Sequence, residues 1–330
     1  MKNLILIFTL VFINFSLIAQ DVNSKKLKIT AGWYWPDELK EVSNKVAFAK
    51  SLGFNAMIWC SGTQDKEFIN ACKKNSILPF KIMEPLSKKY GTRLQVLTHE
   101  EKTIDQKHTL HQYGGEPAKG KQDILSKKLL CPTDDKIIKN VNDEVKRIIK
   151  LGYKGICWDF IGYRNLKSCH CMTCTDKIKL LSKDKPINLA AFYESQLIEL
   201  YNRLETEIKN IDKKIISACH IHPTYLPNPF YASKIKIDHC AVTCSWFFLP
   251  HWKKSKINNH IETTTSFSSG IPMIAYYQSG PMSSHTKSKK QIDFEFKILH
   301  KYKKKGLMIC ELGSIYGQDH LIKKIQKLLK

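Results

Sequence analysis

The sequence predicts a (β/α)8 barrel, and two observations carry this prediction. Short apolar runs typical of buried strands alternate along the chain with helix-spaced amphipathic stretches, an order typical of a parallel sheet. Eight strand candidates occur over roughly 300 residues, which fits a closed barrel with insertions. An open doubly wound sheet is the alternative, but no G-x-G-x-x-G motif follows the first strand.

The first half of the chain supplies four of these strands. Val42, Val46, Ala49 and Leu52 have helical spacing, and Gly53 follows them as a C-cap. The strands are expected at 27–35, 54–60, 77–84 and 155–160, and the helices at 41–52, 65–74 and from 131–133 to Gly152. Residues 86–129 form a long polar insertion after the third strand, and a loop of this length in a compact domain is usually functional or mobile.

The second half continues the alternation. A long helix over 189–211 precedes the fifth strand, and the helical pattern between the sixth and seventh strands is the weakest. The remaining strands are expected at 214–222, 237–247, 271–278 and 307–312, and the last two helices at 292–302 and 318–329.

The amino-terminal stretch MKNLILIFTLVFINFSLIAQ has one early lysine, an apolar run from Leu4 to Ile18 and a small residue at Ala19. This pattern predicts a signal peptide over residues 1–19. A membrane anchor is the alternative, but the run is short for a span and polar sequence follows it. We expect an exported protein, periplasmic or extracellular, with no stable membrane anchor after cleavage. No linker or repeat divides residues 20–330, so we expect one catalytic barrel domain.

The formal net charge of +23 suggests an acidic partner, such as nucleic acid or a sulfated or uronic polysaccharide. Nearly all of this positive charge is lysine, whereas specific recognition of phosphate or carboxylate favours the fork of arginine. The lysines are widely scattered along the sequence, which argues against a nucleic-acid groove. Two interpretations of the lysine excess remain: solvated surfaces of the protein that bind no ligand, and a surface that binds an acidic polysaccharide.

Three predicted strands end in a carboxylate: Asp159, Glu311 and Glu84. The chemistry of (β/α)8 barrels lies at the carboxyl ends of the strands, and a charge at the end of a buried strand must be satisfied or used. Glycosidic cleavage usually takes two carboxyl groups, so these three are the candidate catalytic residues. The alternative for each is a structural carboxylate that caps a loop or pairs with Arg164 or a lysine.

Strand alternation sets conditions on these carboxylates. An inward Asp159 places Cys157 and Gly155 inside the barrel and turns Trp158 toward the helices. An inward Glu311 would take Ile309 and Leu307 with it, and an inward Glu84 requires Lys81 to face the helices.

Aromatic and histidine side chains also gather at the predicted strand ends. Sugars present apolar C–H faces for stacking and hydroxyl groups for hydrogen bonds, so this mixture suits a carbohydrate site, with ordinary packing as the alternative. The two histidines of the fifth strand share one face, where a catalytic metal held with a carboxylate is a further alternative. The candidate substrate-binding residues are Trp33, Trp35, Trp59, Arg164, His220, His222, Trp246 and Tyr277.

Eleven cysteines occur in the chain, several of them inside apolar runs where they read as small buried hydrophobes. Cys169, Cys171 and Cys174 differ, because they form a C-x-C-x-x-C run in the loop after the fourth strand. Thiolates bind zinc tetrahedrally, and Cys131 is the best candidate for a fourth ligand. We expect a structural zinc ion here and no organic cofactor. Disulfides, which are common in exported proteins, and free thiols are the alternatives.

This cysteine layout resembles that of the family 42 β-galactosidases, (β/α)8 glycoside hydrolases in which a cysteine before a Pro-containing helix start and a C-x-C-x-x-C after the fourth strand hold zinc. Cys131-Pro132-Thr133 and the C-x-C-x-x-C run match that layout over residues 130–174. The family ends its fourth strand with Asn-Glu, its acid/base, where this chain has Trp158-Asp159. Trp-Asp is similar to the nucleophile position of α-galactosidase-type barrels, but the sixth strand, CAVTCSWFF, offers no matching acid. The resemblance implies a glycoside hydrolase-like barrel that is not a β-galactosidase proper.

Together these features predict an exported glycoside hydrolase acting on a polysaccharide or its oligosaccharides. Asp159 would be the nucleophile or the acid/base, with Glu311 or Glu84 as its partner. One alternative is a polysaccharide lyase, in which His220 or Tyr277 abstracts a proton and a basic residue neutralises a uronate. The other is a glycan-binding barrel without catalysis.

Overall fold

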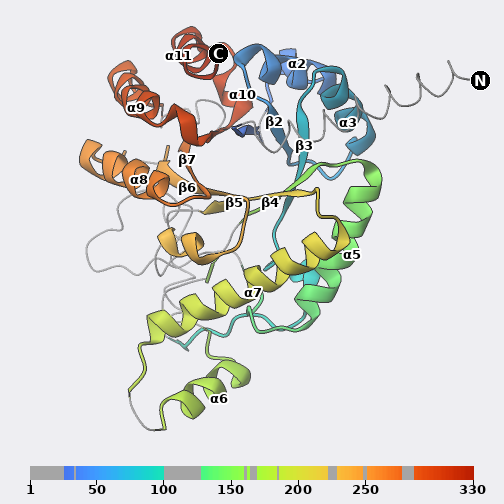
Figure 1. Ribbon diagram of the computed structural model, residues 1–330, viewed down its shortest axis with the longest axis vertical. Coiled ribbons are helices and arrows are strands. Elements are labelled where there is room, and N and C mark those ends of the chain that lie inside the picture. Colours follow the sequence, from blue (N-terminus) through green and yellow to red (C-terminus); the bar gives the residue numbers. More distant parts are fainter. Residues whose placement is uncertain are drawn as a thin grey trace, which may run out of the picture.

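The computed structural model describes residues 26–32, 35–99, 128–159, 162–163, 169–183, 186–221, 229–247, 251–276 and 286–330. Within them, eight parallel strands form a closed barrel in which each strand pairs with the next and β8 pairs with β1. Helices surround the strands, with α2 and α11 side by side although they lie at opposite ends of the sequence (Figure 1). The (β/α)8 barrel is confirmed.

The strands and helices follow the predicted order. The strands are β1 (Lys28–Ala31), β2 (Ala56–Trp59), β3 (Leu78–Met83), β4 (Gly155–Trp158), β5 (Ile216–Ile221), β6 (His239–Ser245), β7 (Gly270–Ala275) and β8 (Leu307–Cys310). The α-helices are α2 (Val42–Leu52), α3 (Asp65–Lys74), α5 (Lys136–Leu151), α6 (Met172–Leu181), α7 (Leu189–Ile211), α8 (Lys254–Ser266), α9 (Lys289–Lys301), α10 (Leu312–Ile315) and α11 (Asp319–Leu329). Short 3-10 helices are η1 (Asp37–Leu39), η2 (Lys88–Tyr90), η4 (Pro229–Lys234) and η6 (Lys303–Lys305).

Local sequence signals explain where several helices begin and end. Gly53 and Gly152 close α2 and α5 in the left-handed conformation, with φ of 99° and 108°, and their N–H groups bond to carbonyls of the last turn. Ser288 and Gln291 form a capping box at the start of α9. The weak helical pattern between the sixth and seventh strands is a helix, α8.

The strand register separates an interior face from a helix-facing side. On the helix side, Trp158 donates to Glu205 of α7 at 2.6 Å, and Lys81 bonds to Asp65 of α3. The interior face includes Ile29, Ala31, Ala56, Ile58, Phe80, Ile82, Gly155, Cys157, Ala218, His220, Ala241, Thr243, Met273, Ala275, Met308 and Cys310. A side chain at Gly155 would meet the ring of Phe80 at 2.3 Å, so glycine is required where that ring crosses the barrel.

The insertion after β3 occupies residues 84–135 and carries the predicted long segment, of which 100–127 lie outside the described residues. An isolated antiparallel bridge between Leu94 and Leu130 joins its two described ends. Helix α6 was not predicted, and Figure 1 shows it set apart from the helices that cover the barrel. Among the described helices, none is both long enough and apolar enough to cross a membrane.

Candidate active site

Asp159 lies directly after β4 and is 2% exposed. Its N–H donates to the carbonyl of Met83 at 2.8 Å, which extends the pairing of β3 and β4 by one residue. Oδ1 of Asp159 lies 2.9 Å from Nδ1 of His220 on the neighbouring strand β5. As predicted from alternation, Cys157 faces the interior and Trp158 faces the helices. The strand ends therefore bring a buried carboxylate and a buried imidazole into direct contact.

Thr243 of β6 completes this contact and was not among the predicted site residues. Its hydroxyl donates to the carbonyl of Ile221 at 2.9 Å, and its oxygen lies 3.2 Å from Nε2 of His220. Because the single hydroxyl proton is used on Ile221, the Thr243 oxygen accepts from the ring. Both ring nitrogens of His220 therefore have a hydrogen-bond partner, Asp159 at Nδ1 and Thr243 at Nε2. The alternation of β6 was the available signal, since it puts this polar residue on the interior face.

Glu311 lies directly after β8 and is also 2% exposed. The hydroxyl of Ser314 donates to its Oε1 at 2.7 Å, and the peptide bond that precedes Glu311 is cis. The condition that alternation set for an inward Glu311 is not met, because Met308 and Cys310 face the interior in place of Leu307 and Ile309. Since the strand ends at Cys310, the alternation of β8 does not determine the direction of Glu311.

Asp159 and Glu311 both influence the pKa of the same two interior thiols, Cys60 and Cys310. Burial raises the pKa of the Cys60 thiol, and the negative charges of Asp159 and Glu311 act in the same direction. Burial is also the main cause of the raised pKa of the Cys310 thiol. The charges of Cys60 and then of the same two carboxylates raise this pKa further. Because such interactions weaken with distance, both carboxylates lie near the same part of the barrel interior.

Glu84 follows β3 and is partly buried. The condition for its inward direction is met, since Lys81 faces the helices and its Nζ lies 2.6 Å from Asp65 of α3. Burial raises the pKa of Tyr201 on α7, and the charges of Cys219, Asp159 and Glu84 contribute in that order. Glu84 is thus a third carboxylate at this end of the barrel.

The predicted aromatic residues divide between two places. The Trp246 ring lies 6.0 Å from the His220 ring, centroid to centroid, and joins the candidate site. Trp35 packs over Gly32 at the end of β1, and the ammonium of Lys45 lies 4.8 Å from its ring centroid.

Trp59 is not brought to Asp159 and His220, but it lies near Trp35, because the Lys45 ammonium is also 5.8 Å from the Trp59 ring centroid. It points to the helix side, where it stacks on Phe68 of α3 at 4.7 Å and its indole N–H donates to the Thr63 carbonyl. The reason is its position in β2, where it pairs with Lys81 on the helix-facing side. The other candidates Trp33, Arg164, His222 and Tyr277 lie outside the described residues.

The four predicted metal-ligating cysteines do come together. The Sγ atoms of Cys131, Cys169, Cys171 and Cys174 all lie within 4.8 Å of one another, and all four residues are buried. The separations of Cys131 from Cys174 and Cys171, 3.5 and 3.7 Å, are too long for disulfides, and all eleven cysteines of the chain are free.

These four thiols fit a tetrahedral zinc ion by their chemistry and spacing. Four sulfurs at roughly 2.3 Å from a shared zinc would lie roughly 3.8 Å apart. Backbone N–H groups of Val96 and Cys171 donate to the sulfur of Cys169, at 3.1 and 3.4 Å, as expected for a thiolate ligand. Hydrogen bonds from Cys169 and then Cys174 hold the pKa of Cys131 well below its usual range.

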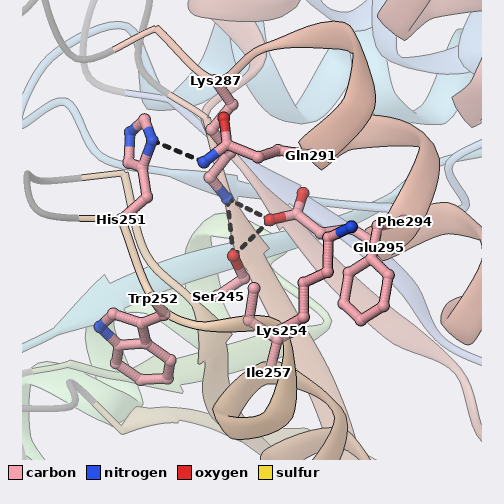
Figure 2. Close-up of a pocket in the computed structure, with 9 residues that line it drawn as sticks. All are labelled: Ser245, His251, Trp252, Lys254, Ile257, Lys287, Gln291, Phe294 and Glu295. Atoms are coloured by element: carbon pink, nitrogen blue, oxygen red, sulfur yellow. Dashed lines mark hydrogen bonds and ion pairs between the residues drawn. The ribbon is translucent and has the colours of Figure 1, made fainter.

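A second polar cluster, which sequence reasoning missed, lies on the helix side of β6 and β7. Figure 2 shows Lys287 between Ser245 and Glu295, with Nζ at 2.9 Å from the serine oxygen and 2.8 Å from the carboxylate. Tyr276 donates to the other oxygen of Glu295 at 2.6 Å. The adjoining cavity of about 20 Å³ has room for about one water molecule. This cluster joins the ends of two strands to α9 and does not face the candidate site.

The fold and site define a (β/α)8 barrel with carboxylates at the carboxyl ends of its strands. No family model matches the sequence, and a comparison with curated proteins finds no match. Among solved structures, the glycoside hydrolase domain of PgaB (BpsB) from Bordetella bronchiseptica aligns with a TM-score of 0.61 at 10% identity, over 93% of this chain and 99% of that chain.

Two further solved structures show the same similarity. The catalytic domain of β-amylase from Paenibacillus polymyxa aligns with a TM-score of 0.55 at 9% identity, over 93% of this chain and 98% of that one. α-L-Fucosidase isoenzyme 2 from Paenibacillus thiaminolyticus aligns with a TM-score of 0.54 at 11% identity, over 92% of this chain and 49% of that one. At such identities the similarity shows a shared fold, and function has to be argued from the site.

Proposed function

We propose that this protein is a glycoside hydrolase whose reaction takes place where β4, β5 and β8 end. The observation that carries the proposal is the buried Asp159–His220 contact at 2.9 Å, with the second buried carboxylate, Glu311, near the same interior thiols. Two carboxyl groups at this end of a (β/α)8 barrel are what glycosidic cleavage requires. The similar solved structures, a glycoside hydrolase domain, an amylase and a fucosidase, support the same class.

In the proposed mechanism Asp159 is the nucleophile. The bond from His220 orients its carboxylate toward the anomeric carbon, as a displacement needs a defined direction of approach. Glu311 protonates the departing glycosidic oxygen, and Glu84 is the alternative donor at the same end. A water molecule, deprotonated by the same residue, then releases the sugar from Asp159.

His220 acts in this mechanism as a positioning residue. Both of its ring nitrogens are hydrogen-bonded, to Asp159 and to Thr243. In a lyase with His220 as the base, one ring nitrogen would have to turn to the substrate, whereas both are occupied by Asp159 and Thr243, so this geometry favours hydrolysis over that alternative.

The test is product release from neutral, uronic and sulfated polysaccharides by the wild type and by Asp159→Asn. New reducing ends from the wild type, with a loss of at least about 100-fold in the variant, would support the proposal. Unsaturated products that absorb in the ultraviolet would indicate a lyase instead. Equal activity in both proteins would remove Asp159 from the mechanism.

The variants Glu311→Gln and Glu84→Gln identify the proton donor that acts with Asp159. Replacing the true donor lowers the activity of the enzyme more on substrates with poor leaving groups than on activated aryl glycosides.

We further propose that the four-cysteine cluster holds a structural zinc ion. Such an ion would fasten the loop after β4 to the start of α5, beside Asp159. Purified wild type should contain about one zinc per chain, and Cys174→Ser should lose the metal and melt at a lower temperature. Cys72→Ser, a buried free cysteine on α3, is the matched control and should keep its zinc. Equal zinc content in all three proteins would contradict the site.

Export is part of the proposal, and it rests on the apolar amino-terminal stretch. We expect the chain to be recovered outside the cytoplasm and to begin after Ala19, which amino-terminal sequencing of the fractionated protein tests.

A further inference from the structure

Eighteen of the 49 lysines of the chain gather at one end of the barrel. At this end α2, α3, α5, α7, α8 and α9 finish and the chain turns into the next strand, opposite the end that carries Asp159 and Glu311. We call this surface the lysine face. It comprises residues 26–28, 49–55, 71–77, 148–154, 208–215, 231–238, 263–269, 298–306 and 326–330.

The lysine face contains eighteen lysines and two aspartates, a net charge of +16 out of +23 for the chain. Sixteen of the eighteen lysines are exposed, and the densest groups are Lys73–Lys74, Lys213–Lys214 and Lys303–Lys305. Among the described residues only two of the eighteen form ion pairs, Lys209 with Asp238 and Lys234 with Glu194. The face is therefore a largely unneutralised positive surface.

The opposite end has a much smaller excess. Counted in the same way, the loops that follow the strands and the first four residues of each α-helix contain, within the described residues, fifteen lysines and arginines against eleven aspartates and glutamates. The net charge of that end is +4 against +16 for the lysine face, so the positive charge of the described barrel is concentrated at one end of its axis.

Helix dipoles explain only part of the arrangement. Lysine in the last turn of a helix is favourable because it faces the negative end of the dipole. Several of these lysines lie outside the α-helices, for example Lys154, Lys236 and Lys303–Lys305. The crowding is unfavourable within the protein itself. Burial lowers the pKa of His300, and the charges of Lys327, Lys303 and Lys324 lower it further.

We propose that the lysine face binds the surface of an anionic lipid bilayer, with the barrel axis upright and the candidate active site facing away from the membrane. A planar anionic surface can meet many lysines of a broad face at once, and each lysine within a Debye length contributes to binding. Lysine suits this role because it acts as a point charge and needs no directed partner. This binding is independent of the proposed hydrolase activity.

An anionic polysaccharide is the competing partner, and the geometry disfavours it. A polymer held on the lysine face would lie at the end of the barrel remote from Asp159, so the face would not deliver substrate to the candidate site. A membrane held there leaves that site open to the surroundings.

The experiment measures sedimentation with vesicles of phosphatidylcholine alone or mixed with phosphatidylglycerol. All eight strands lie after residue 26, so the chain from residue 20 onwards retains the closed barrel and omits the apolar run. The test variant replaces Lys303, Lys304 and Lys305 by Gln, and the matched control replaces Lys88, Lys128 and Lys253, three exposed lysines at the opposite end. Circular dichroism and melting temperature establish that both variants are folded.

We expect wild type and control to bind the anionic vesicles at low salt and to release them at roughly 0.5 M salt, because the Debye length is then only a few Å. The Lys303–Lys305 variant should bind roughly tenfold more weakly or worse. Equal losses in both variants, or equal binding to neutral vesicles, would overturn the proposal. Binding to soluble alginate that depends on Lys303–Lys305, without binding to vesicles, would also overturn it and identify an anionic polysaccharide as the partner.

Discussion

Thr243 carries two hydrogen bonds through one hydroxyl group, and both end on groups that are buried. It donates to the Ile221 carbonyl and accepts from His220, which in turn contacts Asp159. The orientation of the candidate nucleophile thus depends on a small residue that is two contacts away from it.

Thr243→Val should test this dependence, because valine keeps the shape and removes the hydroxyl. The Ile221 carbonyl and Nε2 of His220 would lose their partner inside the barrel, which costs about 1–3 kcal/mol of unfolding free energy. Thr243→Ser keeps the hydroxyl and should lose less, about 1 kcal/mol for the buried methyl group. Urea unfolding measures both, and equal losses would show that the hydroxyl contributes nothing.

Glu205 is a buried carboxylate whose charge opposes folding. It lies on α7, 2% exposed, and accepts from the indole N–H of Trp158 at 2.6 Å. Burial raises its pKa from 4.5 to about 7, against the hydrogen bonds of Ser217 and Trp158. Between pH 4.5 and 7 the folded protein therefore keeps a proton that the unfolded chain has released. The free energy of unfolding falls as pH rises through this window, and the loss is complete above pH 7.

Glu205→Gln should remove this loss, because the amide oxygen can still accept from Trp158 and carries no charge. The variant and the wild type should have similar stability near pH 4.5. Above pH 7 the variant should be more stable by up to roughly 3 kcal/mol. Urea unfolding at pH 5 and pH 8 measures the difference, and the same difference at both values would rule out titration of Glu205 as its cause.

At the residue scale, sequence reasoning succeeded for the faces of β4. Its alternation predicted an inward Asp159 with Cys157 inside and Trp158 outside. It failed for β8, where an inward Glu311 required Leu307 and Ile309 inside while Met308 and Cys310 face the interior. Trp59 was chosen for its position at a strand end without regard to the face it occupies. Asp159 and Glu311 both lie one residue past their strands, where side-chain direction depends on the contacts and the turn that follow, and alternation carries no information about these.

At the scale of elements, the buried cluster around Lys287 connects β6 and β7 to α9. Lys287→Met would leave the Glu295 carboxylate buried without its cation, a loss that typically costs about 3–5 kcal/mol. Lys146→Met is the matched control, because Lys146 pairs with Asp143 on the surface of α5, where an ion pair contributes at most about 1 kcal/mol. Thermal and urea unfolding of both variants measure the contrast. A loss for Lys287→Met no larger than that of the control would show that the pair does not hold these elements together.

Helix α6 shows why one element escaped prediction. Only Cys174 of this helix is buried, while Met172, Leu180 and Leu181 are exposed. The sequence therefore lacks the apolar stripe by which a helix is recognised. The cysteines of this region could be predicted to meet, because their spacing is a chemical signal that does not depend on helix packing.

At the scale of the whole molecule, the fold was predictable because the eight buried runs and the intervening helices repeat in order. No further sequence signal is needed to infer that the eight strands close into a barrel. The polarity of charge was not predictable from composition. Turns between helices and strands are separated by tens of residues in the sequence, so their lysines look scattered until the barrel places every such turn at one end.

The interior of the barrel is shared by all eight strands, and Gly155 tests how tightly it is filled. A methyl group at this position would lie 2.3 Å from the Phe80 ring, which is itself fully buried. Gly155→Ala therefore forces strands or the ring to move, and overpacking of this kind costs about 1–3 kcal/mol. Gly62→Ala is the control, since no atom lies within 4 Å of its added methyl group, and it should be neutral or slightly stabilising. Urea unfolding of both variants measures the difference. If Gly155→Ala were as stable as Gly62→Ala, the Phe80 ring could leave the space above Gly155 without loss, and the interior would not be the close-packed layer on which the positions of Asp159 and His220 depend.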